Sequence, residues 1–155
     1  MQKAFLFIAL LLFSIACEKP ADIDKVFNAL EAGQYDWVVS QVDAGFDVNQ
    51  SDADGVSLLM IASKLRETSL VEALINQGAD INHRTKKGIT ALMIAAKAGD
   101  SETVRTLLEN GADTEHTTIH GWSAIILAAR YGDSETLSVL ESYTTKEELL
   151  AERNE

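Results

Sequence analysis

The sequence has little of the chemistry that enzymes use for catalysis. It contains one cysteine and three histidines in 155 residues. A hydrolytic site needs a nucleophile with a base within hydrogen-bond reach. Cys17 lies near the N-terminus, where it has a different predicted role, and the three histidines fall in predicted loops: His83, His116 and His120. We therefore expect a chain that is not an enzyme and that needs no cofactor.

Metal and phosphate sites are not indicated either. His83 and His116 are expected on neighbouring loops about 8–10 Å apart, whereas the ligands of one metal ion must converge to about 2 Å from it. Residues 52–55 resemble part of a calcium loop, but Gln50 and Ile61 stand where the EF-hand pattern requires ligands. The glycines recur at wide intervals and do not cluster before one helix, as a phosphate cradle would require. Solvated loop histidines and a polar turn are the simpler interpretation.

Positive charge is scarce. Thirteen lysines and arginines oppose 24 aspartates and glutamates, which gives a formal net charge of −11. Such an acidic chain is repelled by the phosphate backbone of nucleic acids and by anionic lipid headgroups. We therefore expect no nucleic-acid partner. Solubility and steering of a partner are both open interpretations of the excess negative charge.

The apolar run near the N-terminus is too short for a comfortable membrane span. Residues 4–16 form thirteen uncharged positions after Lys3, whereas a spanning helix needs about 20 residues. This length is typical of the apolar segment of a signal peptide, and the small residue Ala16 precedes the only cysteine, Cys17. An ordinary signal peptide cleaved after Ala16 and an uncleaved anchor are the alternatives.

The residues before this cysteine resemble the lipobox of bacterial lipoproteins, although Ser14 stands where leucine is more usual. The resemblance implies that residues 1–16 are removed, that Cys17 carries lipid, and that residues 17–21 form a short linker. A multi-chain lipid anchor holds more firmly than one acyl chain, at about 0.8 kcal/mol per buried methylene. Glu18 follows where aspartate would favour the inner membrane. The resemblance thus implies an exported protein anchored to the outer membrane and facing the periplasm.

From Asp22 onward the sequence repeats itself with a period of 33 residues. Two glycine positions recur at this spacing, namely Gly55, Gly88 and Gly121, and Gly45, Gly78 and Gly111. Three similar octapeptides follow the same lattice, at residues 55–62, 88–95 and 121–128. A period of this length indicates stacked supersecondary units, which bury their apolar faces only against one another.

These octapeptides and the closing segments at residues 44–49, 77–82 and 110–115 resemble the ankyrin repeat. The resemblance implies an all-α solenoid of four helix–turn–helix repeats with short β-hairpin fingers. It places the repeats at residues 22–51, 52–84, 85–117 and 118–155. The first and last repeats carry polar residues at core positions, and we expect them to cap the stack.

Local signals support the helix pairs. Three hydroxyl side chains are expected to cap the first helices: Ser57, Thr90 and Ser123. Asp24 is expected to do the same in the first repeat, and Thr145 to open a short final helix through a capping box with Glu148. Arg66 lies in the turn between two helices, at the position that glycine occupies in the other repeats (Gly33, Gly99 and Gly132). Either this turn keeps its left-handed residue at a cost of about 1 kcal/mol, or its shape changes.

The remaining functional candidate is a surface. In ankyrin repeats the partner usually meets the fingers and the inner face of the first helices, which implies three columns of binding residues. The columns are Val56, Ile89 and Trp122; Lys64, Lys97 and Arg130; and Leu65, Ala98 and Tyr131. Tryptophan, tyrosine and arginine are enriched in binding hot spots, so the fourth repeat gives the sharpest prediction. Alternatively, the two rings only cover the junction between repeats, and the cations only favour the helix dipole.

We expect a membrane-tethered module that binds a protein partner in the bacterial envelope through its concave face. The basic column suggests an acidic stretch on that partner, and the polar end repeats suggest a monomer. A further basic group, Arg84, Lys86 and Lys87, is expected to be a solvated finger tip, with extension of the groove as the alternative. The alternative function is an immunity protein that neutralises a secreted toxin or effector such as a phospholipase.

Overall fold

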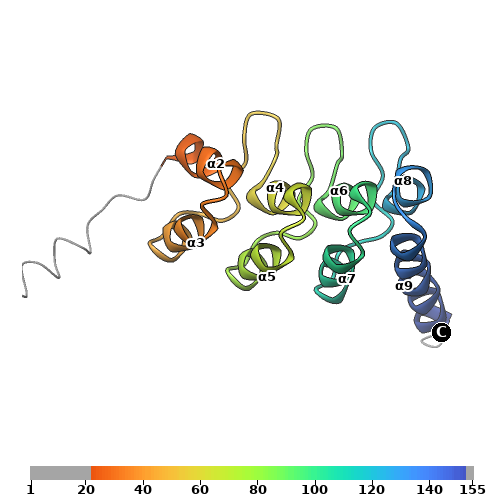
Figure 1. Ribbon diagram of the computed structural model, residues 1–155. Coiled ribbons are helices and arrows are strands. Elements are labelled where there is room, and N and C mark those ends of the chain that lie inside the picture. The colour runs from red at the N-terminus through yellow and green to blue at the C-terminus, as the bar shows by residue number, and fades with distance from the viewer. Residues whose placement is uncertain (1–21, 153–155) are drawn as a thin grey trace, which may run out of the picture.

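A computed structural model describes residues 22–152, which form eight helices in four antiparallel pairs (Figure 1). The first helices of the pairs are α2 (Ile23–Glu31), α4 (Leu58–Leu65), α6 (Ala91–Ala98) and α8 (Ala124–Tyr131). The second helices are α3 (Tyr35–Asp43), α5 (Thr68–Asn76), α7 (Ser101–Glu109) and α9 (Ser134–Glu152). The pairs stack side by side, so the first helices form one row and the second helices another (Figure 1). The predicted all-α solenoid is confirmed.

The predictions for the N-terminal leader, including lipid on Cys17, lie outside the described residues. Within residues 22–152, no helix combines the length and the apolar character that crossing a bilayer requires.

The first helices begin at polar side chains that accept a backbone N–H from three residues further on. Three of these N-caps were predicted: Ser57, Thr90 and Ser123. In the first repeat the cap is Asp22, which accepts from the Lys25 N–H at 2.9 Å, and the prediction of Asp24 is wrong. Because α2 begins at Ile23, Asp24 lies in its first turn, where its negative charge favours the helix dipole.

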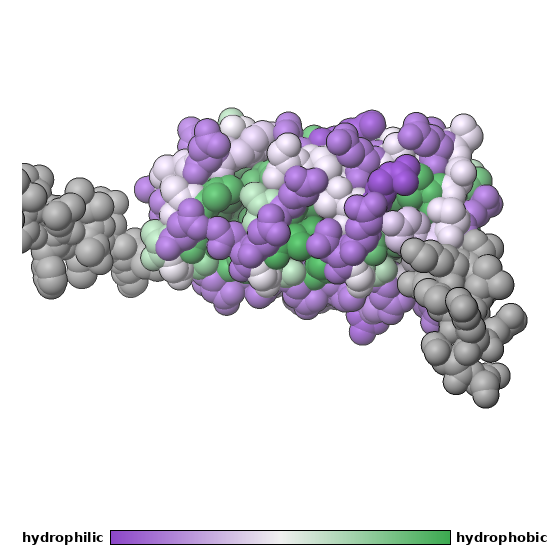
Figure 2. Space-filling view, turned by 90° about the horizontal axis from the view of Figure 1, so that it is seen from below, coloured by the Kyte–Doolittle hydropathy of each residue, from purple (hydrophilic) through white to green (hydrophobic). Residues whose placement is uncertain are grey.

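The core lies between the two rows of helices. The first helices contribute small buried residues, Ala62, Ala95 and Ala128, which let neighbouring helices approach closely. The second helices contribute buried leucines at equivalent positions: Leu74, Leu107 and Leu140. Each such leucine stabilises the fold by about 1.5–3 kcal/mol. The side of the second helices is mainly hydrophilic, with apolar strips between the polar side chains (Figure 2).

The second helices of the first three repeats are followed by glycines in the left-handed conformation. The φ angles of Gly45, Gly78 and Gly111 are 102°, 87° and 91°. Thr144 stands at this position in the fourth repeat, and a β-branched residue disfavours that conformation. Accordingly, α9 continues to Glu152. The predicted separate helix opening at Thr145 is therefore wrong, because Thr145 lies inside α9.

A finger connects each helix pair to the next. Each finger is closed by two backbone hydrogen bonds of 2.8–3.0 Å. One runs from Asp52 N to Val56 O and its equivalents, Thr85 N to Ile89 O and Thr118 N to Trp122 O. The other runs from Gly55 N to Asp52 O and its equivalents, Gly88 N to Thr85 O and Gly121 N to Thr118 O. In residues 22–152 the only bridge between extended segments pairs Ser51 with Ser57. The fingers are therefore tight turns with very little strand character.

Asparagine side chains link successive repeats below the fingers. The Asn49 amide donates to the Gly78 carbonyl at 3.1 Å and accepts from the Asp80 N–H at 2.7 Å. Asn82 makes the same two bonds one repeat further on, at 3.1 and 2.9 Å. These bonds fix the register of neighbouring repeats, and with it the spacing of the fingers.

The turns within the helix pairs differ from one another. Arg66 keeps the left-handed conformation, with φ at 62°, and its guanidinium donates to the Ala98 and Gly99 carbonyls at 3.2 Å each. Gly132 is not left-handed, with φ at −79°. It is needed for space instead, because a Cβ there would lie 2.7 Å from the Ala96 carbonyl oxygen.

Candidate binding groove

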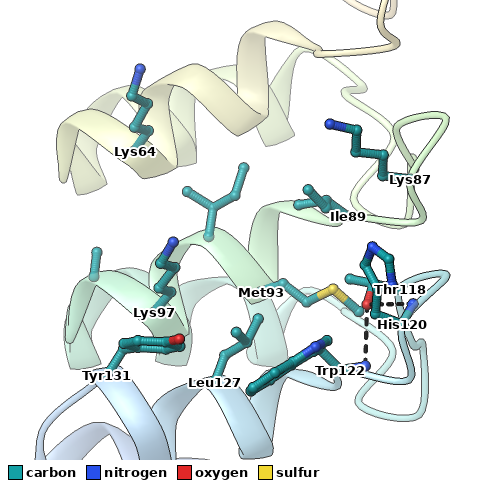
Figure 3. A pocket seen from close by; sticks show the side chains of 12 residues that line it. Lys64, Lys87, Ile89, Met93, Lys97, Thr118, His120, Trp122, Leu127 and Tyr131 are labelled. Atoms are coloured by element: carbon teal, nitrogen blue, oxygen red, sulfur yellow. Dashed lines mark hydrogen bonds between the residues drawn. The ribbon is translucent and has the colours of Figure 1, made fainter.

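A groove of about 710 Å³ lies between α4, α6 and α8 and the last two fingers (Figure 3). Its lining residues are Lys64, Lys87, Ile89, Met93, Ile94, Lys97, Ala98, Thr118, His120, Trp122, Leu127 and Tyr131. Sites of about 300–1,000 Å³ are typical of pockets for small ligands. The groove therefore has room for a few side chains of a partner.

The floor of the groove is apolar. Met93 and Leu127 lie at its centre, with Ile89 on one side and Trp122 on the other (Figure 3). Met93 is almost completely buried, whereas Leu127 and Trp122 are only partly buried. Half-exposed apolar side chains at the bottom of a groove gain free energy when a partner removes them from water, at about 25 cal/mol per Å².

The cationic residues around this floor have no acidic partners. Lys64 and Lys97 lie in the last turns of α4 and α6, and Lys87 approaches from a finger (Figure 3). No carboxylate among residues 22–144 lies within 4.0 Å of these ammonium groups or of the Arg130 guanidinium. The reason is visible in the sequence, since α4, α6 and α8 contain no aspartate or glutamate.

Two rings and two cations stack at the fourth repeat. The Trp122 and Tyr131 ring centroids are 6.4 Å apart, at an angle of 37°. The Arg130 guanidinium lies 5.2 Å from the first ring and 5.5 Å from the second, and Lys97 Nζ lies 5.4 Å from the Tyr131 ring. Cation–π contacts of this kind contribute about 0.5–1 kcal/mol at exposed sites. These contacts hold the Lys97 and Arg130 side chains against the rings, and the N–H groups of both side chains can still donate to a carboxylate of a partner.

The last finger sets the position of Trp122. The Thr118 hydroxyl accepts from the backbone N–H groups of His120 and Trp122 at 3.3 and 3.1 Å. The finger is held against its neighbour by a bond from Ile119 N to Lys87 O at 3.0 Å. Gly88 allows this approach, because a Cβ there would lie 2.9 Å from the Thr117 carbonyl oxygen. Hydrogen bonds to the backbone of the last finger thus fix the backbone position of Trp122.

Most of the predicted binding residues come together in this groove. Six of them line it: Lys64, Ile89, Lys97, Ala98, Trp122 and Tyr131. Arg130 stands over the two rings. Val56 and Leu65 do not line the groove, and both are partly buried against the core. Their role in binding stays a prediction without support from the geometry.

The structure adds residues that the sequence interpretation missed. The main additions are Met93, Ile94, Thr118, His120 and Leu127. Ile94 and Leu127 stand 33 residues apart, so the lattice marks them as equivalent. Their partial exposure on the groove side is the signal that the sequence does not carry, since a helical stripe does not show which part of it the neighbouring repeat covers.

The other basic residues and the histidines have different surroundings. Arg84 and Lys86 line a smaller cleft of about 380 Å³, whereas Lys87 lines the main groove and extends it. The predicted solvated loop histidine is found at His120, which is exposed, whereas His83 and His116 are partly buried. The Nε2 of His83 lies 3.0 Å from the Gly55 carbonyl, and the Nδ1 of His116 lies 2.8 Å from an Asp113 oxygen. No cluster of metal-ligating side chains occurs in the part of the chain that the structure describes.

Two groups with shifted pKa values lie at junctions between repeats, outside the groove. Burial raises the pKa of the Tyr35 phenol, and Glu67, which accepts its O–H at 3.2 Å, raises it further. The backbone N–H of Thr136, at 2.7 Å, lowers the pKa of the Asp133 carboxyl, and the Arg66 charge adds to this. The Tyr35 shift thus reflects a contact between the first and second repeats, whereas the main cause of the Asp133 shift lies within the fourth repeat.

Comparison with known proteins agrees with this architecture. The family model described as ankyrin repeats (3 copies) matches residues 26–118 and residues 59–148. No curated protein matches the sequence. Ankyrin repeats indicate a protein–protein interaction module, and proteins of this family are generally not enzymes. On the helix pairs, the fingers and this match, the chain belongs to the ankyrin-repeat family.

Proposed function

We propose that this protein captures an acidic protein partner in the bacterial envelope through the groove on α4, α6 and α8, as a monomer tethered to the membrane. The observation that carries the proposal is the segregation of charge. In a chain of net charge −11, four of the thirteen lysines and arginines surround one apolar groove. They are Lys64, Lys87, Lys97 and Arg130.

Unpaired surface cations repel one another, and four of them around one groove give that face a positive potential. A partner with carboxylates in the same arrangement relieves the repulsion and is steered toward this face. The apolar floor then adds desolvation energy that is independent of charge. Because the fingers are fixed by backbone bonds, the groove is preformed and binding requires little ordering of the chain.

The membrane tether is proposed from the sequence. Lys3, the apolar residues 4–16 and the lone Cys17 fit a lipoprotein signal. The linker of residues 18–21 would then keep the ankyrin domain close to the membrane surface. On this proposal the groove acts at the periplasmic side of the outer membrane, where it meets envelope proteins.

A charge-reversal experiment tests the groove. The chain and its Lys97→Glu/Arg130→Glu variant are used to capture partners from the envelope fraction of the source bacterium, and the recovered partner is then purified and titrated directly. The matched control is Lys25→Glu/Arg105→Glu, which changes the net charge equally at exposed positions outside the groove. We expect the groove variant to bind at least tenfold more weakly and the control to bind within about twofold. Equal loss in both variants, with unchanged circular dichroism, contradicts the proposal.

The identity of the recovered partner separates a supporting or scaffolding role from immunity. A secreted toxin whose activity is blocked by the chain, and not by the groove variant, would assign immunity. An envelope enzyme that stays active in the complex would assign support.

A labelling experiment tests the tether. Cells expressing the chain are fed a fatty acid that carries a chemical label, and the chain is examined for label and for its presence in the membrane fraction. We expect the Cys17→Ser variant to lose both. A serine variant that stays labelled, or a native chain without label, contradicts lipidation at Cys17.

A further inference from the structure

We infer that the groove recognises a short extended acidic segment with a single large apolar side chain at its centre and carboxylates on both sides. This inference rests on the proposed function and specifies what part of the partner enters the groove. It follows from the order of the groove residues between its finger end and its helix end.

The cations stand at the two ends of the groove, and the apolar surface lies between them. Lys87 approaches from the finger end, and Lys97 lies at the other end, beside Tyr131 (Figure 3). Met93 and Leu127 occupy the space between them (Figure 3). A ligand that satisfies both ends therefore needs negative charge at two separated points and an apolar group in the middle.

The spacing of the two ends limits the length of the segment. Helix α6, which spans the groove, has eight residues, and at 1.5 Å per residue it is about 12 Å long. An extended peptide covers about 3.3 Å per residue, so about four residues separate its two acidic positions. One large side chain at the middle of such a segment lies over the apolar floor.

The charge pattern of the fingers confines the segment to the C-terminal half of the molecule. Lys87 and His120 occupy equivalent finger positions, and both line the groove. The equivalent residue of the preceding finger is Asp54, which would repel a carboxylate. At the finger end, an acidic segment is therefore favoured beside the fingers of the third and fourth repeats and disfavoured beside the finger of the second.

Synthetic peptides of defined sequence test the inference. The first peptide has one phenylalanine flanked on each side by one serine and two glutamates, and carries a fluorescent label. Three related peptides change one property each: phenylalanine to serine, all glutamates to glutamine, and all four glutamates moved to one side of the phenylalanine. Binding is followed by fluorescence polarisation with the full chain. We expect saturable binding of the first peptide and at least tenfold weaker binding of the others.

Variants of the chain locate the peptide. Lys87→Glu at the finger end and Lys64→Glu/Lys97→Glu at the helix end are each expected to weaken the first peptide at least tenfold. The control variant Lys25→Glu/Arg105→Glu is expected to stay within about twofold. High salt weakens the binding, because exposed charges are screened. Equal binding of the phenylalanine and serine peptides, or equal loss in the control, overturns the inference.

The two proposals fail in distinguishable ways. If no peptide binds but Lys97→Glu/Arg130→Glu loses the protein partner, the groove binds a folded surface, so the segment inference is wrong and the proposed function stands. If the groove variant keeps the protein partner at full affinity, the proposed function itself is wrong.

Discussion

The second and fourth repeats have the same backbone plan and differ at the positions that face the groove. Val56 and Leu65 of the second repeat are partly buried against the core, whereas their equivalents Trp122 and Tyr131 line the groove. The two repeats share their N-caps, Ser57 and Ser123, and several buried positions, such as Ala62 and Ala128. The difference teaches that the 33-residue lattice builds the stack and that departures from it locate the binding surface.

The same two repeats also differ in the turn between their helices. Arg66 holds the left-handed conformation that glycine would hold more easily, whereas Gly132 holds an extended conformation open to other residues. Different demands set the residue type at these equivalent places. At Arg66 the side chain donates to a backbone carbonyl of the neighbouring repeat, and at Gly132 there is no space for a side chain. Exchanges between repeats test each of these differences.

The largest expected effect is steric, at Gly132. In Gly132→Ala the new Cβ meets three backbone atoms at 2.7–2.9 Å, and the backbone must shift. We expect a loss of about 3 kcal/mol in the free energy of unfolding, measured by urea denaturation. Gly99→Ala is the matched control, because its Cβ meets nothing closer than 3.4 Å and the cost is the left-handed conformation alone, about 1 kcal/mol. Equal losses would show that space is not the constraint.

The next effect concerns binding. Trp122→Val/Tyr131→Leu gives the fourth repeat the residues of the second, and removes both rings over which the Arg130 guanidinium lies. We expect the affinity for the protein partner to fall about thirtyfold, or about 2 kcal/mol, in calorimetric titration. The reverse exchange, Val56→Trp/Leu65→Tyr, is expected to leave the affinity within about threefold, provided that the variant folds. A comparable change in both exchanges would place the binding surface across the whole concave face.

The scaffold was largely predictable from the sequence, because the same caps, glycines and apolar positions recur in three or four repeats. The N-caps at Ser57, Thr90 and Ser123 and the glycines after the second helices follow from local chemistry. The errors lie at the two ends, where the lattice offers no second copy. Asp22 and Asp24 both precede the same apolar run, and a capping box at Thr145 predicts a new helix only if the preceding helix ends.

The groove was predictable only in part. The cation column and the aromatic residues follow from positions one period apart, which is why Lys64, Lys97 and Trp122 were identified. The stacking of Arg130 on two rings depends on side-chain conformations that a periodic pattern does not specify. The partial exposure of Leu127 depends on how much of its helix surface the neighbouring side chains cover, which the apolar pattern of the helix does not show.

A smaller effect is expected from the asparagine bonds between repeats. Asn82→Ala removes two hydrogen bonds that join the second repeat to the third, and should cost about 1 kcal/mol of unfolding free energy in urea. Glu115 stands at the equivalent place one repeat later. Glu115→Ala is expected to change stability by less than about 0.5 kcal/mol. A larger loss at Glu115 than at Asn82 would contradict the proposed role of the asparagine in fixing the register.

The smallest net effect is expected at Arg66, where two contributions oppose each other. Arg66→Gly removes two exposed hydrogen bonds of 3.2 Å to the carbonyls of Ala98 and Gly99, at a cost of roughly 1 kcal/mol in total. It also relieves the left-handed conformation, which gains about 1 kcal/mol. Stability in urea should therefore change by less than about 0.5 kcal/mol.

Arg66→Ala separates the two contributions, since alanine loses the bonds and keeps the backbone strain, so it should cost about 1 kcal/mol. If both variants lose the same amount, the left-handed turn costs nothing here and the second repeat tolerates arginine without compensation. If the glycine variant is clearly more stable than the natural chain, the guanidinium bonds contribute nothing measurable to stability.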